Sequence, residues 1–433
     1  MINYSKIFDE LFPLNRSIMG EGYRQSLQIL RKFVNFKIHR YKSNLKVFDW
    51  KVPKEWKIKK AYIKYKGKTI IDFKNNNLHV ISYSHPIKKK LSYKELNKNL
   101  FSLPNNPSAI PYMTSYYQKN WGFCLSHSKR LSLNKKGNYE CLIDSSFKNG
   151  YLENGFTRLQ GKSSKINLIS SYLCHPSMAN NELSGPLTLI GVFKNLQKWK
   201  NRNYTYEFLI NPETIGSLCH IKSYGNHLVK KMNSGLVLTC LGGKEKKLSY
   251  KLSKLENSKL DKLMKYLNSK SKIKLRKFDP ARGSDERQYN SPGLNLPVGN
   301  IVRTEYGKFK EYHSSADNKN FMKIESIKKS VKQITEILYL NDHLINFKRN
   351  LPYGELMLGK RDLYPNVNFQ LYRKKSSDNI IDERKQLNLL LNILSYADGK
   401  KDLLDIAIIQ NLNLDELIPV FQKCLKLKLI KVL

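Results

Sequence analysis

The sequence predicts an α/β fold, in which a mainly parallel β-sheet is sandwiched between helices and an antiparallel β module is inserted ahead of most of the sheet. Two observations predict this fold. Between residues 166 and 340, apolar runs of strand length alternate with segments of helical spacing, which is typical of a parallel sheet with helices on both faces. Residues 49–145 instead hold short alternating segments rich in aromatic and β-branched residues, separated by Lys-Gly and Asn-Asn turns. That pattern indicates antiparallel strands.

The chain has 433 residues, which is long for a single hydrophobic core. We therefore expect three parts. A discontinuous main domain covers residues 1–48 and 146–346, and the inserted β domain covers residues 49–145. A linker and a small helical domain make up residues 347–433.

The elements can be predicted in chain order. Amphipathic spacing over residues 7–35, with a turn at 17–20, predicts two short helices. In the β module, residues 60–66 and 77–83 have strand alternation. The main domain then predicts strands at 166–174, 204–210, 235–241, 272–278 and 296–303, and helices at 186–199, from 214, at 258–267 and at 317–340.

The C-terminal region has the pattern of a winged helix-turn-helix unit. After a breaker at residues 351–354, a polar linker leads to helical patterns at 387–396, 402–409 and 414–425 and a closing strand at 429–433. The candidate recognition helix, 414–425, contains Asp415 and Glu416, with Lys423 as its single basic residue. This face favours contact with protein over contact with DNA.

The formal net charge of +42 raises the question of a nucleic-acid or anionic-membrane partner. The basic residues are mostly lysines scattered from Lys6 to Lys431 among Asn and Ile, without an arginine-rich block. We attribute the charge to the codon bias of an AT-rich genome, and expect neither nucleic acid nor membrane as a partner.

The six cysteines have no CxxC spacing and lie mostly in apolar runs, as do reduced thiols of a cytoplasmic protein. No apolar run approaches the roughly 20 residues of a membrane helix, so we expect a soluble, cytoplasmic, unexported protein. Whether it forms a homo-oligomer is left open.

Three loops at predicted strand ends hold residues that can bind a metal. Ligands of open α/β sheets bind beyond the carboxyl ends of the strands. Residues 173–185 carry His175, Asn181 and Glu182, residues 210–217 carry Glu213, and residues 310–317 carry His313. Imidazole and carboxylate groups suit zinc, which lowers the pKa of bound water so that a nearby carboxylate can take its proton. Such a site hydrolyses amide bonds.

Each of these residues also has a structural interpretation when taken alone. A histidine at a strand end is often a hydrogen-bonding residue, and Glu213 could cap the helix that follows it. Tyr312 and His313 could simply pack within their loop. The joint appearance of these groups at successive strand ends favours the metal site.

Residues 174–185, 212–217, 283–289, 291–293 and 311–317 resemble the motifs of an aminopeptidase-like family of bacterial proteins, distantly related to zinc aminopeptidases with two metals. The resemblance spans essentially the whole chain, because that family also carries an inserted β module and a C-terminal winged helix. It implies a three-layer, zinc exopeptidase-like fold.

The resemblance also implies roles for individual residues. His175 and His313 look like the two histidine ligands, and Glu213 like the base or a ligand, with Pro212 in the place of its partner carboxylate. Asn181 stands where an Asp usually bridges two metals, and Glu182 beside it is a substitute ligand.

A further acid of the family is replaced by Gly242-Gly243. These departures indicate one of three outcomes: a single zinc ion in place of two, weaker metal binding, or a different reaction. Asp285, Glu286, Arg287 and Tyr312 would shape the substrate pocket. Arg287 would either hold a substrate carboxylate or form an ion pair with a neighbouring acid.

The function predicted from these features is zinc-dependent hydrolysis of an amide bond, on a peptide or an amide-bearing amino sugar. The resemblance links it to surface polysaccharide biosynthesis. The alternative is a catalytically depleted scaffold that acts as a binding or regulatory protein through its winged-helix and β modules. Aromatic residues of the β module could stack on sugars, but we expect them to form its core; they include Trp50, Trp56, Tyr112, Tyr116 and Tyr117.

Overall fold

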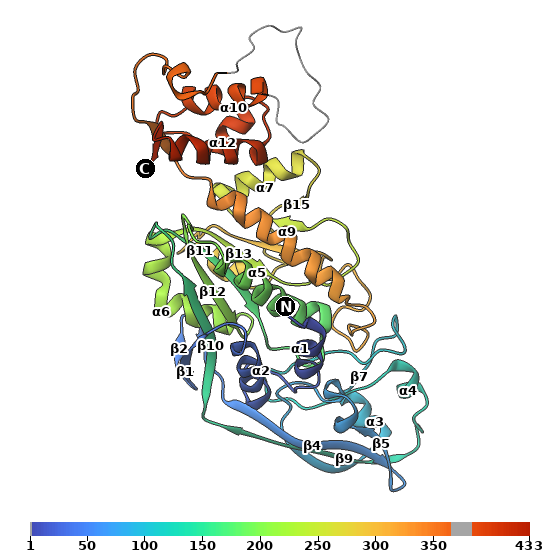
Figure 1. The fold of residues 1–433 in the computed structure, drawn as a ribbon. Coiled ribbons are helices and arrows are strands. Elements are labelled where there is room, and N and C mark those ends of the chain that lie inside the picture. The colour runs from blue at the N-terminus through green and yellow to red at the C-terminus, as the bar shows by residue number, and fades with distance from the viewer. Residues whose placement is uncertain (1, 365–382) are drawn as a thin grey trace. The chain divides into compact units, whose positions relative to one another are not determined.

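The computed structural model describes residues 2–364 and 383–433. The chain divides into two compact units, Met1–Thr335 and Glu336–Leu433. Figure 1 shows the helices and strands of both units. The boundaries expected for the main domain and the β module stay predictions, since both parts lie within the first unit.

The core of the first unit is an eight-stranded sheet in the order β1-β10-β12-β11-β13-β16-β14-β15. Its four central strands run parallel: β12 (Thr205–Asn211), β11 (Ile166–Tyr172), β13 (Met232–Leu238) and β16 (Val298–Val302). Antiparallel pairings attach β10 (Tyr151–Leu159) with β1 (Lys37–Lys42) at one side, and β14 (Ser249–Lys251) at the other, where β15 (Lys274–Arg276) pairs parallel to β14. The mainly parallel sheet expected from the sequence is confirmed.

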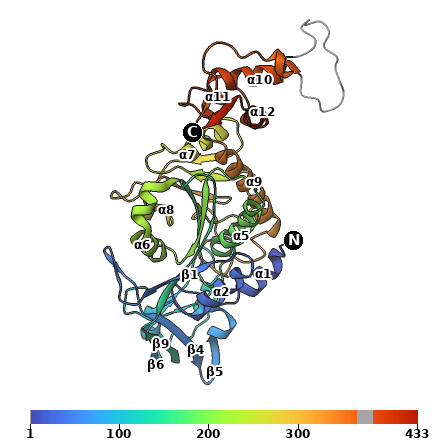
Figure 2. The same ribbon diagram turned by 60° about the vertical axis from the view of Figure 1, so that its left-hand side comes forward.

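Helices cover both faces of this sheet, with α5 (Ser184–Gln197) on one face and α6 (Ile215–Lys231) on the other (Figure 2). Every residue of β11 and β12 is buried, which explains why these strands read as continuous apolar runs. The two expected N-terminal helices are α1 (Tyr4–Leu11) and α2 (Glu21–Arg31). The remaining helices are α7 (Lys259–Ser269), α8 (Glu286–Tyr289) and α9 (Ile324–Asp342).

One helix start was predicted wrongly. The long helix expected from residue 317 begins at Ile324, because the preceding residues form turns and the Asp317 carboxylate accepts hydrogen bonds from the backbone of Asn180 and Asn181. The short strand β14 was not predicted at all.

The inserted module contains an antiparallel sheet in the order β5-β4-β9-β6. Its strands are β4 (Glu55–Tyr65), β5 (Lys68–Asp72), β6 (Ile87–Ser92) and β9 (Asn138–Lys148). Shorter elements complete it: β2 (Lys46–Val47), β3 (Trp50–Lys51), α3 (Tyr93–Leu96), β7 (Leu100–Phe101), β8 (Phe123–Cys124) and α4 (His127–Leu131). The strand expected at residues 77–83 is instead a tight helical turn followed by isolated bridges, because the Asn76 side chain accepts a hydrogen bond from the Leu78 amide and starts a turn.

The second unit contains α10 (Glu383–Ser395), α11 (Leu403–Ile409) and α12 (Leu414–Lys426), and β17 (Phe347–Arg349) pairs antiparallel with β18 (Ile430–Val432). Asp402 and Asp405 form a capping box at the start of α11. The expected winged helix is confirmed. Residues 365–382 of the expected polar linker lie outside the described residues. Within the described part of the chain, the helices are too short or too polar to cross a membrane.

Candidate functional site

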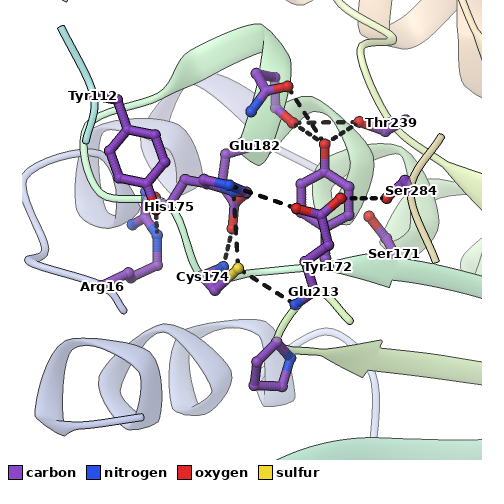
Figure 3. Close-up of polar contacts among 12 residues, drawn as sticks. Arg16, Tyr112, Ser171, Tyr172, Cys174, His175, Glu182, Glu213, Thr239 and Ser284 are labelled. Atoms are coloured by element: carbon purple, nitrogen blue, oxygen red, sulfur yellow. Dashed lines mark hydrogen bonds and ion pairs between the residues drawn. The ribbon is translucent and has the colours of Figure 1, made fainter. Parts of the chain in front are cut away.

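The three predicted loops meet at the carboxyl ends of the parallel strands. His175 follows β11, Glu213 follows β12, and His313 lies in the loop between β16 and α9. His175 Nε2 lies 3.6 Å from Glu213 Oε2, and the imidazole rings of His175 and His313 have centroids 5.5 Å apart. The structure therefore brings together two imidazoles and a carboxylate that are up to 138 positions apart in the sequence. Figure 3 shows His175 and Glu213 of this group.

Glu182 fixes the orientation of His175. It lies on a π-helical turn, Ala179–Leu183, and its Oε2 is 2.5 Å from His175 Nδ1 while its Oε1 accepts from the Cys174 amide. Both oxygens of Glu182 are thus occupied. With Nδ1 bound to this carboxylate, Nε2 is the His175 nitrogen that faces Glu213, the arrangement usual behind a metal-binding histidine.

Asp317 ties the His313 loop to the turn that carries Glu182. Its carboxylate accepts from the amides of Asn180 and Asn181 at 2.7 and 2.8 Å. The Asn181 side chain points elsewhere: its Oδ1 lies 3.7 Å from Cys240 Sγ, and its Nδ2 has no partner. Asn181 is buried, and its backbone and side-chain oxygens face Tyr172, Thr239 and Cys240.

Glu213 is held by a serine that the sequence did not assign to the site. Ser284 Oγ donates to Glu213 Oε1 at 2.6 Å, which leaves Oε2 as the oxygen nearer His175. Burial raises the pKa of Glu213, and the neighbouring His175 and Ser284 oppose that rise. A carboxylate with a raised pKa is a better proton acceptor than an exposed one.

Asp285, Glu286 and Arg287 support the neighbouring loops and do not line the pocket beside His175. Asp285 accepts from Asn211, Ser217 and the Thr214 amide, and so fixes the turn after β12. Glu286 is buried against Lys251. Arg287 donates to the backbone oxygens of Ser284 and Pro280 at 3.3 and 3.4 Å, whereas its expected ion-pair partner Glu286 is paired with Lys251.

Tyr312 stacks on His313, with ring centroids 3.9 Å apart. The backbone of His313 is left-handed, with φ of 51°, as is that of Thr214, with φ of 64°. Positive φ is unfavourable for bulky and β-branched residues, and such strain collects at functional sites.

The pocket beside these groups has a volume of about 510 Å³ and is also lined by the inserted module. The Tyr112 amide donates to the His313 oxygen at 2.8 Å, so the module lies directly against the site. Its aromatic residues divide into two groups. Trp56 and Tyr112 are buried, as expected of core residues, but Trp50 and Tyr117 are 40% and 50% exposed.

The two histidines differ in their electrostatics. Burial lowers the pKa of His313 to about 3, helped by the positive charge of His175, so His313 is neutral and its nitrogens are free to bind a metal. Burial also disfavours charge on His175, but Cys174 and Glu182 outweigh it and hold the pKa of His175 well above its usual value.

Arg16 supplies a positive charge behind the site. It is fully buried, and its Nε donates to the backbone oxygen of His175 at 3.1 Å. Burial lowers the pKa of Arg16 to about 10, and the charge of Glu182 opposes that fall. Arg16 had no signal in the sequence, because its contact with His175 joins positions 159 apart. Ser284, by contrast, lies in a motif that the sequence did single out.

Two sets of donors could hold a metal. Ligand atoms of Cys174, His175 and Glu182 lie within 4.8 Å of one another. In that set, however, the oxygens of Glu182 already accept hydrogen bonds, and burial raises the pKa of the Cys174 thiol to about 12. The set made by His175 Nε2, Glu213 and His313 faces the pocket instead, and its nitrogen and oxygen donors suit zinc. Among the described residues, however, the donor atoms of this second set do not all lie within 4.8 Å of one another.

Comparison with known proteins places this site in a family. A family model described as "Domain of unknown function (DUF4910)" matches residues 5–343. The chain belongs to this family. A model described as winged helix-turn-helix matches residues 346–432, as in the second unit. A Clostridium acetobutylicum relative of this DUF4910 protein is 41% identical over 404 residues, 93% of this chain and 89% of the relative. It is provisionally named a polysaccharide biosynthesis protein with an aminopeptidase-like domain.

Solved structures resemble this DUF4910 chain at two levels. A provisionally assigned peptidase from Clostridium acetobutylicum has 37% identity and a TM-score of 0.87, over 99% of this chain and 96% of that one. A zinc aminopeptidase from Bacillus subtilis has 11% identity and a TM-score of 0.55, over 78% of this chain and 94% of that one. A peptidase M28 precursor from Shewanella amazonensis has the same identity and TM-score, over 78% and 92%. The last two comparisons show that the aminopeptidase fold is shared.

Proposed function

We propose that this protein is a zinc-dependent hydrolase of amide bonds. The observation that carries the proposal is the arrangement of His175 Nε2, the Glu213 carboxylate 3.6 Å away and the neutral His313 on one wall of one pocket. The shared fold of the zinc aminopeptidases supports it, because such folds bind their ligands at these strand ends.

His175 and His313 would hold one zinc ion, with the Glu213 carboxylate beside it. When bound, zinc polarises a carbonyl oxygen and lowers the pKa of water. Glu182 keeps the Nδ1 proton of His175 in place, so that Nε2 remains available. Glu213 is the single acid among the described residues that line the pocket, and it accepts the proton of the attacking water. Ser284 holds the other carboxylate oxygen during this transfer.

The test begins with metal content, measured by elemental mass spectrometry on protein purified without chelator or affinity tag. We expect about one zinc per chain, with loss of zinc in His175→Ala and His313→Ala and retention in the control His127→Ala, which changes a histidine of α4 outside the pocket. A chain that takes up no zinc after incubation with the metal would refute the proposal, and would favour a binding scaffold without catalysis.

The role of Glu213 needs a separate variant. Glu213→Gln keeps an oxygen donor but cannot accept a proton. We expect it to retain zinc and lose turnover of a panel of N-acyl substrates. Turnover by Glu213→Gln at the wild-type rate would refute the role of Glu213 as proton acceptor.

We further propose that the reaction belongs to surface glycan biosynthesis in the cytoplasm. The name of the relative with 41% identity supports the first part. The second rests on the six free, buried cysteines, which suit a reducing compartment.

A further inference from the structure

Aromatic residues of the inserted module also line the pocket beside Glu213. Trp50, Tyr112, Tyr116 and Tyr117 line it. Trp50 and Tyr117 are 40% and 50% exposed, and their rings meet edge to face with centroids 5.5 Å apart at an angle of 74°. Two exposed rings at such an angle form an apolar corner. Large exposed apolar groups beside a reactive site indicate contact with a ligand.

The backbone supports a functional role for this corner. Tyr117 has φ of 65°. Phe48, in the turn between β2 and β3, has φ of 56° and lies two residues before Trp50. Bulky residues rarely adopt this left-handed conformation. A core role does not account for keeping Tyr117 in it, since its ring is half exposed. Strain of this kind is retained where a side chain has to be presented in a particular place.

The charge of the pocket indicates what kind of group occupies the corner. The chain carries 77 Lys and Arg residues, yet none of the described residues that line this pocket is Lys or Arg. A carboxylate or phosphate ligand would therefore lack a cationic partner. Glu213 is the one acid there, and it is already engaged by Ser284 and His175. A free α-ammonium group, as on a peptide N-terminus, would have to compete for that carboxylate.

An uncharged ring with polar edges matches these features. The faces of Trp50 and Tyr117 suit the apolar face of a pyranose, since aromatic rings stack on such surfaces. Thr114, Tyr116 and Thr214 line the same pocket and carry hydroxyl groups of the kind that pairs with the hydroxyls of a sugar. The hydroxyls of Tyr112 and Tyr116 are 3.0 Å apart; one proton serves that bond, which leaves the other for a ligand.

We propose that Trp50 and Tyr117 form a subsite for the pyranose ring of an acetamido sugar, whose amide reaches Glu213. The proposal rests on the proposed amide hydrolysis for the choice of an amide-bearing sugar. Sugar binding itself needs neither zinc nor turnover. The subsite selects the substrate, and the strand-end loops perform the reaction.

The test measures binding by isothermal titration calorimetry on the full-length chain, kept zinc-free with a chelator so that no turnover occurs. The probes are N,N′-diacetylchitobiose and N-acetyl-leucinamide, which share an N-acyl amide but differ in the group that carries it. We expect saturable binding of the disaccharide, weakened about tenfold in Trp50→Ala and in Tyr117→Ala, at the upper end of what an aromatic contact contributes. Tyr151→Ala removes an exposed tyrosine of β10 outside the pocket, and should bind like the wild type.

Several results would overturn the subsite. Absence of disaccharide binding to the wild type would do so, as would equal binding by all three variants. Binding of N-acetyl-leucinamide alone, weakened by the same two substitutions, would assign the corner to an apolar amino-acid side chain. Because Trp50 and Tyr117 are largely exposed, the variants should unfold at the wild-type temperature, and a thermal scan checks this. Disaccharide binding by a chain that never hydrolyses an amide would refute the proposed function and leave the subsite standing.

Discussion

Replacement of Glu182 by Gln tests the orientation of His175 with one change of atom type. The Glu182 carboxylate accepts from two donors, the Cys174 amide and His175 Nδ1. Gln has a single acceptor oxygen, so its NH₂ group must oppose one of these donors. A buried donor without a partner costs about 1–3 kcal/mol. If the unpaired donor is His175 Nδ1, the proton is no longer held on Nδ1. It can then move to Nε2, the nitrogen that faces Glu213, and a protonated Nε2 cannot bind a metal.

We therefore expect two effects of Glu182→Gln. The free energy of unfolding should fall by about 1–3 kcal/mol, and zinc affinity by about 10- to 100-fold, as for other residues that orient a metal-binding histidine. Competition with a chromophoric chelator measures the affinity, and urea denaturation the stability.

Glu207→Gln is the matched control for this experiment. Glu207 is equally buried, on β12, and accepts from Arg158, but it does not line the pocket. It should lose stability while zinc affinity stays unchanged. Equal zinc affinity in Glu182→Gln and wild type would refute the orienting role, and with it the choice of Nε2 as the ligand atom.

Three further predictions concern Ser284, the pair of Glu55 and Arg24, and DNA binding. Ser284→Ala should lower turnover about tenfold or more, because a hydrogen bond to a charged group contributes about 1.5–3 kcal/mol, while zinc content stays at the wild-type level; wild-type turnover would contradict this. The pKa of Glu55 is lowered by its hydrogen bonds to Arg24, so this pair stabilises the fold above the ordinary pKa and its contribution is lost as pH falls below it. Urea denaturation should accordingly show a stability gap between wild type and Glu55→Gln that is constant near neutral pH and narrows as pH falls below the ordinary pKa of 4.5. A gap that stays constant below this pH would contradict the assignment. In a gel-shift assay the full-length chain should not retard duplex DNA, and a retarded band that weakens with added salt would show DNA binding.

The sequence predicted the central parallel strands of the sheet well because their signals are local, but it did not predict the antiparallel strands β1, β10 and β14. Continuous apolar runs marked β11 and β12, which are buried throughout. The predictions from these sequence patterns failed where a side chain accepts a backbone hydrogen bond and so replaces the regular helix or strand. Asp317 looks like a helix start, but its carboxylate binds the amides of Asn180 and Asn181. Asn76 likewise begins a turn where alternation predicted a strand.

The candidate site was predictable only in part. Strand-end loops indicated His175, Glu213 and His313, which the structure brings to one pocket. The separate roles of Glu182 and Glu213 could not be predicted, because hydrogen bonding in the folded chain decides them. Glu182 is hydrogen-bonded to His175 Nδ1, so it orients this histidine. Arg16 was not detectable, since its contact with the His175 oxygen comes from tertiary packing alone.

The space behind the site favours a single ion. In a two-metal aminopeptidase site, by resemblance, acids would be expected at Asn181 and at Gly242-Gly243. Here the Gly242 amide donates to Asn180 Oδ1 at 2.8 Å, so the Asn180 side chain is bound to the backbone of this loop. A Cβ added at Gly242 would collide with Met322, and one at Gly243 with Thr304. Neither glycine can become an acid unless its neighbours move. At Gly242-Gly243 other atoms fill the space that a carboxylate would occupy, and this supports the proposal of one zinc ion instead of two.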